Sequence, residues 1–120
     1  MDAQNPTLLN NYSYSLAERG LQLQRALEMA KKAVDAQPEN ASFLDTIGWV
    51  YYQLGNYREA ETYIKRAIEK GETNATLYEH LGDVYFKLNY KDKALEQWNR
   101  ALELDKGNTA LRDKVTRGTL

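Results

Sequence analysis

The stretch Ala41–Asn74, ASFLDTIGWVYYQLGNYREAETYIKRAIEKGETN, contains two helical patterns separated by a short turn. In its first half, Leu44, Ile47, Gly48 and Tyr51 recur at i, i+3, i+4 and i+7, which places them on one face of a helix. Small and apolar residues share a face in the second half too: Ala60, Ile64 and Ala67. Gly55 lies between the halves, where a residue with positive φ can end a helix. The stretch therefore predicts two antiparallel helices.

The same pattern returns at a period of 34 residues, in units 7–40, 41–74 and 75–108. Three columns keep one residue type in all units: Ala26/Ala60/Ala94, Ala33/Ala67/Ala101 and Asn40/Asn74/Asn108. Asparagine accepts hydrogen bonds from the free N–H groups at a helix start, so the last column predicts N-caps. The expected helices lie near 7–19, 22–36, 41–54, 57–70, 75–88, 91–105 and 109–117. Short connections predict helix hairpins stacked in series.

This pattern resembles the tetratricopeptide repeat. Two units carry it in full: Leu44-x2-Ile47-Gly48-x2-Tyr51 with Ala60-x3-Ile64 and Ala67, and Tyr78-x2-Leu81-Gly82-x2-Tyr85 with Ala94-x3-Trp98 and Ala101. The resemblance covers residues 7–108 and implies an all-α fold, a right-handed superhelical solenoid of antiparallel helix pairs. We expect a single domain over residues 1–120. In it, a degenerate first repeat (7–40) precedes repeats 41–74 and 75–108.

The two ends of the predicted array differ. In the first unit, Tyr14 stands at the position that Gly48 and Gly82 occupy in the other two units. Leu8 and Tyr12 are more apolar than a solvent-facing terminal helix requires. We therefore expect this helix either to be covered by a preceding repeat of a longer protein or to cause weak self-association. Residues 109–117 resemble the solvating helix that closes such arrays. Its Leu111 and Val115 are predicted to face inward, with the charged residues, Lys114 among them, outward.

Composition excludes several classes of function. The 16 basic and 17 acidic residues give a net charge of −1 and are mixed along the chain, which argues against nucleic-acid or polybasic membrane binding. Cysteine is absent and His80 is the only histidine, so we expect no enzyme, no metal and no cofactor. His80 is interpreted as a surface or groove residue. We expect no signal peptide and no membrane insertion, and the sequence is compatible with cytosol or periplasm.

The resemblance implies that the first helix of each unit lines a concave groove. Six residues at groove positions are predicted to bind a partner: Asp45, Trp49, Tyr52, Glu79, Asp83 and Phe86. The repeat pattern does not require the three aromatic residues among them, and exposed aromatic side chains in a concavity commonly anchor interfaces. The alternative is that they pack against the neighbouring repeat. The expected ligand is a protein or peptide segment with apolar and basic residues.

One known subclass of the family holds a C-terminal carboxylate with lysine, arginine and asparagine. The matching positions here are Asn11, Ser15, Thr46, Thr76 and His80. They include no lysine or arginine, so a carboxylate would gain no charge-assisted hydrogen bond from these cations. The sequence therefore predicts a non-enzymatic protein-interaction module that does not bind acidic chaperone tails. The alternative is the C-terminal structural segment of a longer array, serving assembly.

Overall fold

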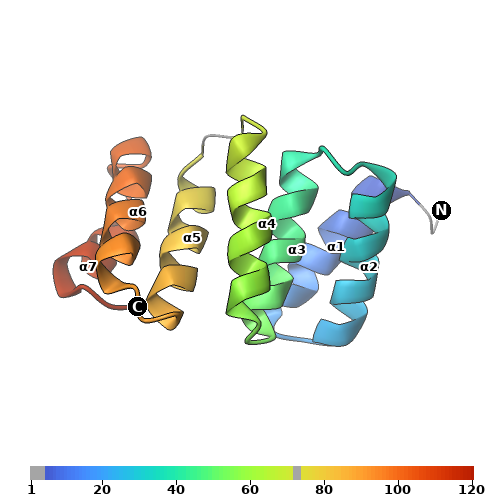
Figure 1. Cartoon of the computed structure of the whole chain (residues 1–120), viewed down its shortest axis with the longest axis horizontal. Helices are drawn as coiled ribbons and strands as arrows, with labels where there is room; N and C mark the ends of the chain where they lie inside the picture. Colours follow the sequence, from blue (N-terminus) through green and yellow to red (C-terminus); the bar gives the residue numbers. More distant parts are fainter. Residues whose placement is uncertain (1–4, 72–73) are drawn as a thin grey trace.

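The computed structural model describes residues 5–71 and 74–120, and within these ranges the chain is all-α (Figure 1). Its helices are α1 (Pro6–Arg19), α2 (Leu23–Ala36), α3 (Ala41–Gln53), α4 (Tyr57–Glu69), α5 (Ala75–Lys87), α6 (Lys91–Leu104) and α7 (Thr109–Arg117). The helix pairs α1/α2, α3/α4 and α5/α6, and then α7, follow one another along the longest axis of the molecule, which measures 44 Å against 26 and 23 Å for the other two (Figure 1). The predicted all-α, tetratricopeptide-like architecture is confirmed.

The helix starts follow the predicted caps. The Oδ1 atoms of the three repeated asparagines accept hydrogen bonds from backbone N–H groups three residues ahead: Asn40 from Phe43, Asn74 from Leu77, and Asn108 from Leu111. Each such cap stabilises its helix by about 1 kcal/mol. Helix α2 begins one residue later than expected, because Gln22 adopts a left-handed conformation with φ of 46°.

Glycine allows the two helices of each hairpin to cross closely. A Cβ atom built on Gly48 would lie 2.7 Å from Ile64 Cγ1 and 3.3 Å from the carbonyl oxygen of Ala60. At Gly82 it would lie 2.3 Å from Cδ1 of Trp98, a fully buried side chain. The nearest atoms to this position all belong to Trp98, whose indole ring lies against the glycine.

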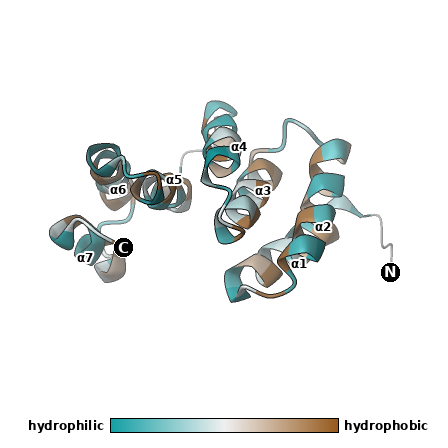
Figure 2. Ribbon diagram, turned by 60° about the horizontal axis from the view of Figure 1, so that its bottom comes forward, coloured by the Kyte–Doolittle hydropathy of each residue, from teal (hydrophilic) through white to brown (hydrophobic). Residues whose placement is uncertain are grey.

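The two helices of the first hairpin are joined by a side-chain hydrogen bond at a position where the other two hairpins have apolar side chains. Ser13 occupies the position of Ile47 and Leu81, is fully buried, and donates a hydrogen bond of 2.7 Å to the carbonyl oxygen of Ala26. Hydrophobic residues remain exposed at this end of the array: Leu8, Tyr12 and Leu21. Hydrophilic and hydrophobic residues share the helices, as amphipathic packing requires (Figure 2). Among the described helices, none has the length and apolar character needed to cross a membrane.

Candidate functional site

The predicted groove aromatics of α3 form a stack. The Trp49 ring lies 4.5 Å from Tyr52 with an interplanar angle of 5°, and 3.8 Å from the His80 ring of α5 with an angle of 14°. Trp49 is only 8% exposed, because His80 covers one face of its indole. The expectation of an exposed Trp49 is therefore wrong, and the neighbouring repeat contacts it as the alternative interpretation stated. Tyr52 stays half-buried.

His80 connects the aromatic stack to the acidic groups. Its Nδ1 lies 3.1 Å from Oδ1 of Asp45, and the residue is 6% exposed. The interpretation of His80 as a surface residue is thus corrected: it is a buried contact between α3 and α5. Oδ1 of Asp45 faces His80, while its Oδ2 makes no hydrogen bond to the described residues. Asp45 therefore keeps one carboxylate oxygen for another donor.

The acidic pair of α5 is already neutralised within the chain. Nζ of Lys114, from α7, donates to Oε2 of Glu79 at 2.7 Å and to Oδ1 of Asp83 at 3.1 Å. Burial lowers the pKa of Lys114, but the charge of Asp83 and the contacts with Glu79 outweigh it, so the net pKa is raised. The prediction that Lys114 points outward is wrong, because its side chain is only 19% exposed and reaches across to α5. Two of the three acidic residues in the predicted groove are thereby occupied.

Asp83 also belongs to the core. It accepts a hydrogen bond of 3.0 Å from Nε1 of Trp98, and the residue is 5% exposed. Burial raises the pKa of the Asp83 carboxyl, and the opposing effects of Lys114 and Trp98 do not cancel this shift. Phe86 is half-buried, with its ring 5.9 Å from that of Trp98. Asp83 therefore serves packing between α5, α6 and α7.

These contacts repeat with the array. Asp45 meets His80 and Glu79 meets Lys114, and in both pairs the partners are 35 residues apart. Each pair joins an acidic residue of one first helix to a basic residue of the next, at 2.7–3.1 Å. His80 and Lys114 were absent from the predicted site. A search of the sequence for opposite charges at this spacing would have found both, because residues one period apart lie on adjacent first helices.

A polar hollow of about 470 Å³ lies between α1, α3 and α5. It is lined by Asn10, Asn11, Tyr14, Ser42, Asp45, Thr46, Asn74 and Thr76. Asn10 is 6% exposed, and its Oδ1 has no hydrogen-bond partner among the described residues. Burial, and then the charges of Glu18 and Asp45, raise the pKa of the Tyr14 hydroxyl to about 12. The walls therefore combine oxygen acceptors with a negative potential.

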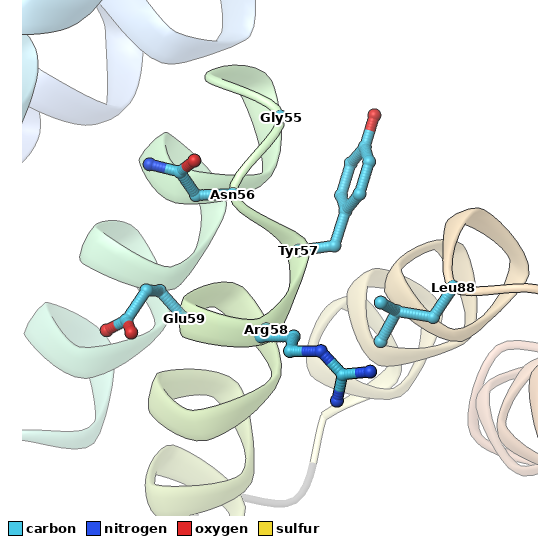
Figure 3. A pocket seen from close by; sticks show the side chains of 6 residues that line it. All are labelled: Gly55, Asn56, Tyr57, Arg58, Glu59 and Leu88. Carbon is cyan, nitrogen blue, oxygen red and sulfur yellow. The ribbon is translucent and has the colours of Figure 1, made fainter.

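A second hollow, of about 360 Å³, lies where the turn before α4 faces Leu88 at the end of α5 (Figure 3). Arg58 and Glu59 project from its walls in different directions, so opposite charges border it (Figure 3). This surface shows no preference for one sign of charge. Among residues 5–71 and 74–120, no three histidine, cysteine or acidic side chains are grouped so that they could hold a metal ion.

Comparison with known proteins identifies relatives of the chain. PA4667, a TPR repeat-containing protein of Pseudomonas aeruginosa, is 35% identical over 60 residues, which cover 50% of this chain and 10% of that protein. The matched part of the chain thus spans about a tenth of that relative's length.

Solved structures share the fold. The first TPR of Spaghetti (RPAP3), bound to the HSP90 peptide SRMEEVD, is similar with a TM-score of 0.85 and 21% identity, covering 98% of this chain and 93% of that one. YrrB, a TPR protein with an unusual peptide-binding site, is similar with a TM-score of 0.81 and 27% identity, covering 98% and 60%. The family model described as Tetratricopeptide repeat matches residues 4–113. The chain belongs to the tetratricopeptide repeat family.

Proposed function

We propose that this chain is a non-enzymatic protein-interaction module that binds a peptide or protein segment along the face formed by α1, α3 and α5. The observation that carries the proposal is the hollow of about 470 Å³ between these three helices. Tyr52 and Phe86, further along α3 and α5, keep part of their aromatic surface exposed. Such partly exposed aromatic side chains next to polar groups are typical of interface anchors. The similarity to YrrB, which has a peptide-binding site, supports the same function.

The chemistry of the ligand follows from the unpaired groups. Asp45 retains one oxygen, and Glu18 adds a second negative charge near Tyr14. Of the five positions that match the carboxylate-binding subclass, His80 is already in contact with Asp45. We therefore propose a ligand with apolar and basic side chains. The acidic peptide SRMEEVD, bound by the Spaghetti domain, is expected to cause no saturable shift in an NMR titration of this chain.

The experiment compares partner capture by the wild type and by two matched variants. Tyr52→Ala/Phe86→Ala removes the two aromatic groups of the proposed face, whereas Tyr63→Ala removes a half-buried tyrosine of α4. Each variant is first checked for helicity by circular dichroism. A protein from the source cell that is retained by wild type and Tyr63→Ala but lost by Tyr52→Ala/Phe86→Ala supports the proposal. Equal retention by all three would reject this face as the binding site.

A second function is favoured by the exposed amino-terminal end. Leu8 is 43% exposed and Tyr12 52% exposed, both on α1. The 60 residues matched to the curated relative cover only 10% of that protein, so the relative is about five times longer than this chain. We propose as the alternative that the chain forms part of a longer array, in which a preceding repeat covers α1. Tyr12→Lys would then lower the stability of the extended array by more than that of this 120-residue chain, in which Tyr12 loses its contact with Arg25, as urea unfolding of both would show.

A further inference from the structure

The hollow between α1, α3 and α5 lies next to Thr46, at the position that carries a long basic or aromatic side chain in later repeats. Residues 34 and 68 positions further on are His80 and Lys114. Each of those fills the space beside its helix and contacts an acidic residue of the preceding first helix. Thr46 is too short to do so. The space beside Thr46 is therefore left open, with Asn11 in place of the acidic residue of the later sites and with Asp45 of α3 on its wall.

Lys114 shows what such a site accepts. Its ammonium group makes hydrogen bonds of 2.7 Å to Glu79 and 3.1 Å to Asp83, and its side chain is 19% exposed. Carboxylates that face one side of an interhelix space are thus sufficient, in this fold, to hold a largely buried ammonium. Charge-assisted hydrogen bonds of this kind are the stronger ones.

The lining of the unfilled hollow matches the same chemistry. Its side chains offer oxygen acceptors and one carboxylate, and none of them is basic. The unpartnered Oδ1 of buried Asn10 requires a donor, and Asp45, whose Oδ1 faces His80, adds a carboxylate to the wall. A negative potential is present as well, because the charges of Glu18, Asp45 and Glu79 all act on Tyr14. A primary ammonium supplies three donors and a positive charge in one group.

We propose that the hollow between α1, α3 and α5 is a pocket for a lysine side chain of a partner segment, with Asp45 as its charged acceptor. The proposal rests on the proposed function and specifies which of the three predicted acidic residues contacts the ligand. Glu79 and Asp83 are excluded because Lys114 occupies them. Asp45 also contacts His80, so a lysine would be its second partner; a neutral side chain would add no ion pair there, and an acidic side chain would be repelled.

The test uses NMR titration with three small probes: Nα-acetyl-lysine amide, Nα-acetyl-norleucine amide and n-butylamine. We expect the lysine probe to shift saturably, at millimolar concentration, the side-chain amides of Asn10 and Asn11 and the backbone amide of Thr46. Added salt should weaken the binding, since partly exposed charges are screened. Norleucine amide, which lacks the ammonium, should cause no saturable shift. n-Butylamine, which is the lysine side chain without the amide groups, should bind more weakly than the lysine probe.

Two lysine substitutions provide the matched comparison. Ser42→Lys places a positive charge at the rim of the hollow, and Thr62→Lys places the same charge on α4; both positions are exposed, so the fold is kept. Asp45→Asn is less suitable because Asp45 also contacts His80. Ser42→Lys should weaken the lysine probe about tenfold or more, and Thr62→Lys by less than about twofold.

Four results would refute the proposed lysine pocket. They are shifts with norleucine amide equal to those with the lysine probe, tighter binding of n-butylamine than of the lysine probe, unchanged binding of the lysine probe to Ser42→Lys, and shifts centred on Glu79 and Asp83. Absence of any shift with the lysine probe would do the same. If partner capture still depends on Tyr52 and Phe86, only the lysine pocket has failed. If the lysine probe binds as expected while capture does not depend on that face, the pocket stands and the proposed function fails.

Discussion

Replacing Gly82 by alanine tests the close crossing of α5 and α6. The new Cβ would lie 2.3 Å from Cδ1 and 2.4 Å from Nε1 of Trp98, so the indole must move. Trp98 is fully buried, and its Nε1 donates to Asp83 at 3.0 Å. Overpacking costs about 1–3 kcal/mol. Loss of a hydrogen bond to a charged group costs about 1.5–3 kcal/mol. The better helix propensity of alanine returns about 1 kcal/mol.

The free energy of unfolding of Gly82→Ala should therefore fall by about 2–4 kcal/mol, measured by urea unfolding with circular dichroism. Gly48→Ala should also lower the free energy of unfolding, because the new Cβ would lie 2.7 Å from Cγ1 of Ile64, a fully buried β-branched side chain, and 3.3 Å from the carbonyl oxygen of Ala60. Gly107→Ala, with nothing within 4 Å, should change stability by less than about 0.5 kcal/mol. If Gly82→Ala is as stable as wild type, the interpretation of Gly82 as a packing requirement is refuted.

Two further predictions concern the charged groups. Lys114→Met leaves Asp83 buried without its cation, so the free energy of unfolding should fall by about 2–3 kcal/mol at neutral pH. Loss of the ammonium raises the folded-state pKa of Asp83 further above its unfolded value, so stability is lost as the pH rises through that range. The deficit should hence be smaller at acidic pH, where a larger fraction of Asp83 is protonated, than at neutral pH; an equal deficit in urea unfolding at both pH values would contradict this. The pKa of Tyr14 is raised from 10.0 to about 12, so its contribution to stability is complete below pH 10.0 and lost as the pH rises to about 12. Ultraviolet titration of tyrosinate should lose a late transition in Tyr14→Phe, and loss of a transition near pH 10.0 instead would disprove the shift.

The fold could be predicted because its determinants are local. Asn40, Asn74 and Asn108 mark helix starts by a hydrogen bond to a residue three positions ahead, and the apolar period identifies the packed face. These signals lie within single helices. Helix boundaries consequently agree with the sequence prediction within one or two residues.

The surroundings of the site could not be predicted in the same way, because they depend on contacts between repeats. Helical periodicity places Trp49 off the packing face, but it does not show that His80 stacks on it. In the same way Lys114 lies off the apolar stripe of α7, and only the position of α5 shows that it meets Glu79. The prediction of the six groove residues as partner-binding residues is tested by neither the fold nor the relatives and stays a prediction.

Because Lys114 forms ion pairs with Glu79 and Asp83, the charge along the face formed by α1, α3 and α5 differs between its two ends. Near α7 the acidic groups are paired with the ammonium group of Lys114, whereas near α1 the partners of the acidic groups are His80, for Asp45, and the Tyr14 hydroxyl, for Glu18. An approaching segment with a basic end is then drawn to the α1 end and turned before it makes contact. The orientation of such a segment along the array would accordingly be selected as the two molecules approach each other. Raising the ionic strength would lower the association rate constant by a larger factor than it raises the dissociation rate constant.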